Sequence, residues 1–190
     1  MTSFLIGALL VALGVILWAV LAYNGLVKSR LRVSEAWSTV DIQLKRRSSL
    51  VPNLVETVAG YAGHERQTLE EVTRARAQVQ SAEGAEAAAT ANLQLDKALS
   101  RLLVVVEQYP DLKASAGFLS LQAELSDLEA KIASARQFYN RCVLEYNTSV
   151  GSLPTSLIAQ MARFAPCSFF ELDESAQTPQ VRFTTGASRP

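Results

Sequence analysis

The sequence predicts an all-α protein, in which a single transmembrane helix precedes an antiparallel bundle of long helices, four or three in number. Three observations support this. The first 27 residues carry no charged side chain, later segments repeat apolar residues at intervals of three and four, and the segment with the strongest repeat, residues 118–146, contains neither Gly nor Pro. The 190 residues leave room for one domain beyond the anchor. We divide the chain into an anchor (residues 1–27), a bundle (28–153) and a short helix with an extended tail (154–190).

The anchor is predicted from its length and composition. Residues 4–22 form an almost unbroken run of Leu, Val, Ile, Ala and Gly, and about 20 such residues span a bilayer core. Trp18 and Tyr23 suit the aromatic belt at the membrane interface. A cleaved signal peptide is the alternative, because Val20-Leu21-Ala22 offers small residues to a peptidase. The lack of a basic start and the length of the apolar run favour a retained anchor.

The orientation follows from the charges that flank the anchor. Lys28, Arg30 and Arg32 lie just after the apolar run, whereas only the amino terminus is charged before it. The positive-inside rule then places the N-terminus outside and the bundle in the cytoplasm. Cys142 and Cys167 stand outside any C-x-x-C motif, and reduced thiols are compatible with that compartment.

The strongest periodicity predicts one long helix over residues 112–149. Its apolar seam is a heptad pattern made of Phe118, Leu121, Leu125, Leu128, Ile132, Ala135, Tyr139, Cys142 and Tyr146. Asp111 is the expected N-terminal cap, and the helix should end before Gly151 and Pro154.

The same spacing predicts that the anchor helix continues into the bundle. The seam runs through Val33, Trp37, Val40, Leu44, Arg47, Val51, Leu54, Val58 and Tyr61. Pro52 does not disturb the register, so we expect one kinked helix that breaks at Gly60 and Gly63, with a turn at residues 48–52 as the alternative. Two further helices follow, one around residues 69–79 and one over 85–109, unless Gly84 is only a weak point within a single helix.

The C-terminal part has a different character. Residues 155–163 have the length of one or two helical turns, and residues 165–190 are expected to be extended or partly disordered. Four of the seven Phe residues lie in the last 27 positions, namely Phe164, Phe169, Phe170 and Phe183. The first three are expected to cover an end of the bundle; the alternative is that they dock a partner or the membrane surface.

No constellation of residues predicts catalysis. The sequence has no Gly-rich phosphate loop, and His64, its only histidine, is expected to be a surface or capping residue. We therefore predict no catalytic residue, no metal and no cofactor. Basic and acidic residues number 18 each, so the chain as a whole has no bias toward nucleic acid.

Charge is nevertheless concentrated locally after the anchor. Lys45 and Arg46 are candidates for a partner-binding patch, with a solvated helix face as the alternative. Arg47 lies on the apolar seam, and a buried guanidinium must be paired. We expect a carboxylate within its reach, and the candidates are Glu56, Asp96 and Glu107. Trp37, on the same seam, is expected in the core rather than at a ligand.

A series of motifs along the chain resembles one known family. These are Tyr23-Asn24-Gly25-Leu26-Val27, Ala36-Trp37-Ser38, the run from Val40 to Arg47, Leu50-Val51-Pro52-Asn53-Leu54-Val55-Glu56-Thr57-Val58, Gly60-Tyr61-Ala62, His64-Glu65, Thr68-Leu69-Glu70, Ala75-Arg76, Tyr109-Pro110-Asp111-Leu112-Lys113, Ala135-Arg136, Tyr139-Asn140 and Tyr146-Asn147. Together they are similar to the signature of the LemA family from residue 23 to about residue 183. Ala82-Glu83-Gly84 departs from it, because the family often has Pro-Glu there.

The resemblance implies a bacterial membrane protein with a cytoplasmic helical bundle and no established enzymatic activity. Family members are associated with signalling phenotypes, with a zinc-dependent membrane protease and with organelle membranes of magnetotactic bacteria. Our first hypothesis is a membrane-tethered scaffold or adaptor, with the lipid bilayer as one partner. The second is a structural protein that forms homo-oligomers on the membrane through small-residue faces. The third, an accessory subunit of a membrane protease or sensor kinase, rests on the resemblance alone.

Overall fold

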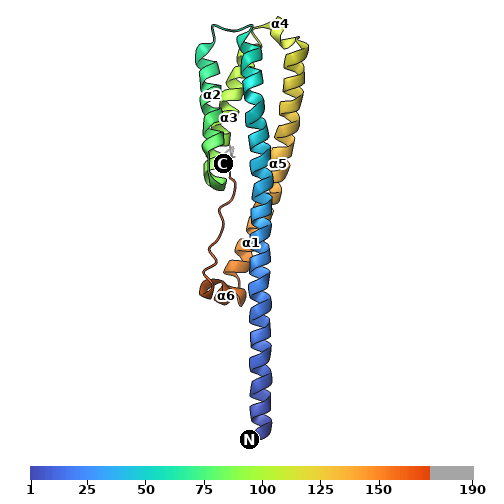
Figure 1. The fold of residues 1–190 in the computed structure, drawn as a ribbon, viewed down its shortest axis with the longest axis vertical. Coiled ribbons are helices and arrows are strands. Elements are labelled where there is room, and N and C mark those ends of the chain that lie inside the picture. Colours follow the sequence, from blue (N-terminus) through green and yellow to red (C-terminus); the bar gives the residue numbers. More distant parts are fainter. Residues whose placement is uncertain (172–190) are drawn as a thin grey trace, which may run out of the picture.

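The computed structural model describes residues 1–171, and these form six helices and no strand (Figure 1). The long helices are α1 (Thr2–Ala59), α2 (Arg66–Ser81), α3 (Gly84–Val106) and α5 (Ala116–Gly151), and the short ones are α4 (Pro110–Lys113) and α6 (Thr155–Met161). The all-α prediction is confirmed. Gly84 takes a φ of +81°, a backbone conformation that suits glycine, and separates α2 from α3. The described chain therefore has four long helices rather than three.

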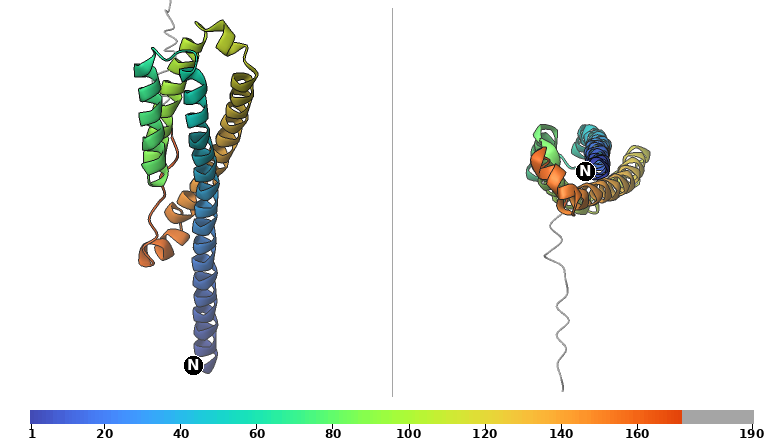
Figure 2. Two further views of the ribbon diagram at one scale, coloured as in Figure 1. Left: turned by 45° about the horizontal axis from the view of Figure 1, so that its top comes forward. Right: turned by 90° about the horizontal axis from the view of Figure 1, so that it is seen from below.

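Helix α1 is the axis on which the others are arranged. It packs along α5 and, on its other side, against α2, while α2 packs against α3. Successive long helices run in opposite directions, as short connections require. Viewed from below, α1 lies between α5 and the pair formed by α2 and α3 (Figure 2).

Helix α1 passes through Pro52 without a break, as predicted from the unchanged register. A proline has no N–H, so it leaves the carbonyl four residues earlier, here that of Ser48, without its helical partner. Arg76 of α2 donates from Nε to this Ser48 oxygen at 3.0 Å. The missing bond within α1 is thus replaced by a bond to a neighbouring helix.

The two predicted seams face the core. Eight of the nine seam residues of α5 are buried, and Leu121 is half-buried. In the other seam the exceptions are Trp37 of α1, which is half-buried, and Tyr61, which lies just after the end of α1 and is exposed. Trp37 packs edge-on against Tyr139, with ring centroids 5.5 Å apart, and lies 6.2 Å from Phe170. Amphipathic periodicity therefore identified the inner faces of both long helices.

The predicted start of the long helix needs correction. Residues 110–113 form the separate turn α4, and Asp111 lies inside that turn rather than capping α5. The cap is Ser115, whose hydroxyl accepts a hydrogen bond from the Phe118 N–H at 3.3 Å. Proline is favoured at the first position of a helix, so Pro110 begins its own turn. Helix α5 also continues to Gly151, two residues beyond the expected end, and α3 ends at Val106 rather than at residue 109.

After α6 the chain turns back along the bundle. We call residues 164–171 the strap; they are not helical and run from α6 toward the middle of the bundle (Figure 1). This agrees with the predicted turns at 155–163 and with an extended segment after them. Phe183 and the rest of the predicted tail lie outside the described residues.

Candidate interaction site

The first third of α1 stands apart from the bundle. Helix α1 is long and apolar enough to cross a membrane, and nothing in its most apolar window is buried. Trp18 is 38% exposed, and the first buried residue of α1 is Leu26. The fully exposed part of α1 therefore ends before Leu26, and the first residue of α1 in the core cluster is Val33. The division of the chain at residue 27 stays a prediction. We call residues 2–21 the stem.

Near this boundary α1 meets the C-terminal part of the chain. Tyr23 lies against Phe164, with ring centroids 5.7 Å apart. Among the predicted membrane-flanking residues, Lys28 and Arg30 are exposed. Arg32 forms an ion pair with Glu145 of α5 at 3.7 Å, and both side chains are mostly exposed. An exposed pair of this kind contributes at most about 1 kcal/mol.

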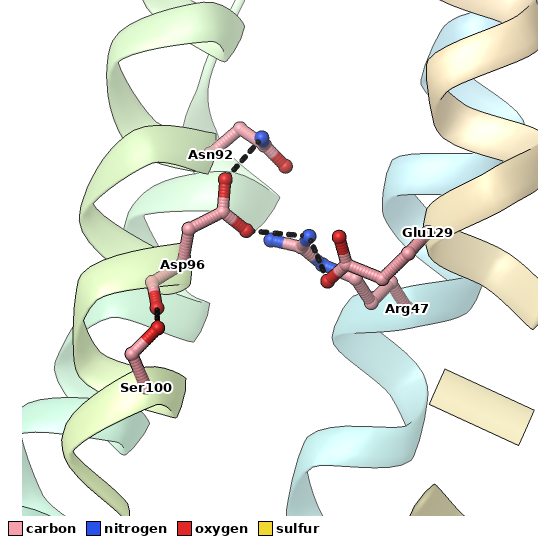
Figure 3. A network of polar contacts seen from close by, with 5 residues as sticks. All are labelled: Arg47, Asn92, Asp96, Ser100 and Glu129. Carbon is pink, nitrogen blue, oxygen red and sulfur yellow. Dashed lines mark hydrogen bonds and ion pairs between the residues drawn. The ribbon is translucent and has the colours of Figure 1, made fainter. Parts of the chain in front are cut away.

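Arg47 is the most deeply buried charged residue among those described, with 1% exposure. Its Nη1 atom lies 2.6 Å from Asp96 Oδ1 on α3 and donates a hydrogen bond to Glu129 Oε1 on α5 at 3.0 Å (Figure 3). Asn92 holds the other oxygen of Asp96 through its Nδ2 at 3.0 Å. One guanidinium on α1 therefore connects α3 to α5, two helices that share little direct contact.

Of the three carboxylates named from the sequence, the structure brings Asp96 to Arg47. Glu107 pairs with Lys113 instead, and Glu56 is exposed. Glu129 was missed because it lies outside the apolar seam of α5, next to Leu128. The network is incompletely satisfied: Arg47 Nε and Nη2 and Asn92 Oδ1 have no hydrogen-bond partner within the described residues.

Lys45 and Arg46 lie in a shallow groove between α1 and α5. Its lining mixes apolar side chains with charges of both signs, and consists of Ile42, Lys45, Arg46, Ser49, Leu50, Glu124, Asp127, Leu128 and Lys131. Lys45 pairs with Asp41 and Lys131 pairs with Asp127, each at 2.6 Å and each on one helix. Arg46 takes part in none of the ion pairs that the described residues form. The groove therefore combines apolar side chains with charged ones, as protein-binding surfaces do.

A second group of residues, which was not predicted as a site, holds the strap to α5. Asn147 binds the backbone of Cys167 with both amide atoms, accepting from its N–H and donating to its carbonyl, each at 2.9 Å. Asn140 does the same for Phe170, at 2.9 and 3.1 Å. The hydroxyls of Tyr146 and Tyr139 donate to the carbonyls of Ala165 and Ser168 at 2.9 and 2.8 Å. We call these four α5 residues the Tyr-Asn ladder.

The ladder works because two periods coincide. Seven helical residues rise about 10.5 Å, and three extended residues cover about 10 Å. A Tyr-Asn pair repeated after seven positions on α5 therefore meets backbone groups three positions apart on the strap. Burial raises the pKa of both tyrosines, and the nearby Cys167 adds to the effect, so the hydroxyls remain donors at neutral pH. The repeated Tyr-Asn dipeptide was the signal available in the sequence.

The strap also places the aromatic residues that the sequence analysis offered as contacts for a partner. Phe170 is 1% exposed and packs into the core, which corrects its assignment as a partner-binding residue. Phe169 and Phe164 are half-buried and lie against the core. These three residues therefore pack against the bundle along the strap, and Phe170 reaches Trp37 in its interior rather than covering an end. Burial raises the pKa of the Cys142 and Cys167 thiols, and both are free.

The geometry defines a class of protein: an all-α bundle whose central helix continues from a candidate membrane span. The chain belongs to the LemA family, whose sequence profile matches residues 36–183. No three His, Cys, Asp or Glu side chains in residues 1–171 are grouped so as to hold a metal ion.

Individual relatives support the same placement. The chain is 26% identical over 152 residues to Protein LemA of Metamycoplasma hominis, a match that covers 80% of this chain and 69% of that protein. It is 30% identical over 84 residues to Magnetosome protein MamQ of Magnetospirillum gryphiswaldense and to Magnetosome protein MamQ 2 of Paramagnetospirillum magneticum. Those matches cover 44% of this chain and 31% of each relative, so the chain spans about a third of the magnetosome proteins.

Proposed function

We propose that this protein is a membrane-tethered, non-enzymatic scaffold that organises other proteins at the cytoplasmic face of the bacterial membrane. The observation that carries the proposal is the continuity of α1 from Thr2 to Ala59, which makes one helix both the candidate span and the centre of the bundle. A bundle attached in this way has little freedom to pivot on the bilayer.

The continuity of α1 sets the reach of the scaffold. From residue 27 to the end of α1 at Ala59 the helix rises roughly 48 Å at 1.5 Å per residue. Surfaces along the bundle are therefore held at defined heights above the bilayer. Tethering two partners to one membrane raises their effective concentration without any new contact between them.

The groove between α1 and α5 is the surface we assign to a protein partner. Its lining includes Ile42, which is 47% exposed, and the charged residues Lys45, Arg46, Glu124 and Asp127. Charges of both signs at a rim favour specificity and steer association. A protein that presents an apolar side chain flanked by charges would match this surface.

Photo-crosslinking in cells tests the scaffold. A photoreactive amino acid replaces Arg46 in the groove or, as the matched control, Arg74, an exposed arginine on α2. We expect a discrete crosslink to another membrane-associated protein from position 46 and none from position 74. A probe at Ser49, in the same groove, should give the same crosslink, and charge reversal by K45E should abolish the crosslink from position 49. Equal crosslinking from positions 46 and 74, or none from 46, would contradict the assignment.

Self-assembly is a second candidate, favoured by the surface of the stem. A Cβ added at Gly7 or Gly14 would meet nothing within 4 Å, and Ala8 and Ala12 are exposed. Small residues let membrane helices approach closely. Co-purification of two differently tagged copies in lipid nanodiscs distinguishes the candidates. If the copies co-purify and the G7I/G14I variant does not, the stem forms an oligomer. If the protein is instead an accessory subunit of a membrane protease or sensor kinase, the protein crosslinked from position 46 should be that enzyme.

The orientation has its own test. Protease added to spheroplasts should leave the bundle intact and digest it only after lysis, because the proposed N-terminus is outside. Digestion from outside would place the bundle on the other face of the membrane.

A further inference from the structure

Helix α6 exposes two of its three large apolar residues, Leu157 and Met161, leaves Ile158 half-buried and buries its small residues Ser156 and Ala159. Leu157 and Met161 are 55% and 83% exposed, and Leu153 just before the helix is 78% exposed. Ser156 and Ala159 face inward, at 8% and 1%. Leu157 and Met161 are four residues apart and so share one face of the helix. A helix on an aqueous surface shows the reverse distribution.

This face lies at the end of the bundle that adjoins the stem. Helix α6 contacts α1 and α5, and Phe164, three residues after it, lies against Tyr23. Figure 1 shows α6 at the lower end of the folded part, beside the point beyond which α1 runs alone to the N-terminus. The candidate span therefore ends at the level where α6 begins.

The surrounding charges suit an anionic surface. Between Glu145 and Glu171 there is no acidic residue, and the only basic residue in that stretch is Arg163, at the end of α6. Lys28 and Arg30 are exposed on the adjoining turns of α1. Apolar side chains flanked by basic ones are typical of helices that lie in a membrane interface. Each basic residue near an anionic leaflet adds to the attraction.

Helix α6 is also held in place. Thr155 donates its hydroxyl to the Ser149 carbonyl at 2.7 Å, which ties the start of α6 to α5. The Tyr-Asn ladder fixes the strap that follows it. The apolar face consequently has a set position relative to the stem, and the level of one determines the level of the other.

We propose that α6 is a second membrane contact, in which Leu153, Leu157 and Met161 enter the interface of the bilayer that α1 crosses. The inference rests on the proposed anchoring by α1. In this arrangement the side chains are buried roughly 5–10 Å into the boundary between headgroups and acyl chains. Two contacts, one through the bilayer and one along its surface, resist tilting of the bundle relative to the membrane and hold the groove between α1 and α5 at a constant height above it.

Depth-dependent quenching in the full chain tests the proposal. Single cysteines are introduced by M161C, L119C or L13C in a background carrying C142A and C167S, labelled with a fluorophore and reconstituted in vesicles of phosphatidylcholine and phosphatidylglycerol. Leu119 is the matched control, because it is 50% exposed and lies near the start of α5, at the other end of the bundle. Leu13 reports on the stem. Quenchers are lipids with a spin label near the headgroup or at mid-chain.

We expect the probe at position 161 to lose most of its emission with the shallow quencher, the probe at 13 with the deep one, and the probe at 119 with neither. Met161→Glu with the probe at 157 should reduce quenching, because a carboxylate resists the interface. Quenching at 13 with none at 161 would overturn the second contact and leave the anchor intact. An unquenched probe at 13 would overturn the anchoring and the inference together.

Discussion

Substitutions within the network around Arg47 are expected to differ in how much they destabilise the fold. Arg47 is 1% exposed, whereas the side chains of its partners Asp96 and Glu129 are 31% and 52% exposed. Removing the cation leaves two carboxylates that water can reach. Removing Asp96 leaves a buried guanidinium with a single partner and deprives Asn92 of its hydrogen bond. We therefore expect D96A to be far more damaging than R47M.

The magnitudes follow from the exposures. Breaking a buried ion pair by deleting one partner costs about 3–5 kcal/mol, because the remaining charge stays buried without a partner. R47M avoids this cost, since the carboxylates that it leaves are 31% and 52% exposed. Because Glu129 remains at 3.0 Å, we expect about 2–3 kcal/mol for D96A. R47M should lie within about 1 kcal/mol of the unmodified protein. E129A should cost about 1 kcal/mol, since the carboxylate it removes is half in water.

Urea unfolding of the detergent-solubilised full chain measures these differences. The fluorescence of Trp37 reports on the core, because its ring packs against Tyr139 and Phe170. D96N is the matched control, since it keeps the shape of Asp96 and removes its charge, and it should fall between D96A and the unmodified protein. Equal destabilisation by R47M and D96A, or a D96A variant as stable as the parent, would refute the reasoning.

Three further predictions concern contacts between helices and along the strap. R76M should cost about 1–2 kcal/mol, because the buried Ser48 carbonyl loses its donor; in a P52A background, where a backbone N–H returns, the cost should shrink, and a double-mutant cycle without coupling would contradict this. N147A should accelerate hydrogen exchange at the Cys167 amide, whereas N147D, which keeps the acceptor, should do so less; unchanged exchange in N147A would argue against the ladder. Because burial raises the pKa of Tyr139 and Tyr146 above 10.0, their contribution to stability is complete below pH 10 and is lost as the pH rises through the raised values. The melting temperature of Y139F/Y146F should therefore fall less between pH 9 and pH 11 than that of the parent, and parallel curves would contradict the assignment.

Much of the architecture could be predicted because it depends on patterns local to the chain. An apolar run of membrane length and two seams with helical period are visible in the sequence, and they correctly indicated the stem and the inner faces of α1 and α5. The ends of the helices were harder to predict. Asp111 and Ser115 are both good caps, and Pro110 decided between them only by starting a turn of its own.

The contacts between helices depend on which elements become neighbours, and periodicity does not specify this. The burial of Arg47 could be read from its place on the seam. Its pairing with Asp96 and Glu129 required knowing that α3 and α5 flank α1 at the same height. The replacement of the helical bond missing at Pro52 by Arg76 likewise depends on how α2 packs.

Whether a residue prefers lipid, the core or water could be predicted without the fold, because these preferences belong to individual side chains and to their period along the chain. The packing of the helices was needed to show that the strap folds back on α5 and that α6 presents Leu157 and Met161 at the level where the stem ends. The physical reason is that a ladder of hydrogen bonds to backbone groups leaves almost no trace in the sequence of the segment that it binds. The backbone of the strap forms the hydrogen bonds with the Tyr-Asn ladder, so the position of the strap matters and its side chains do not.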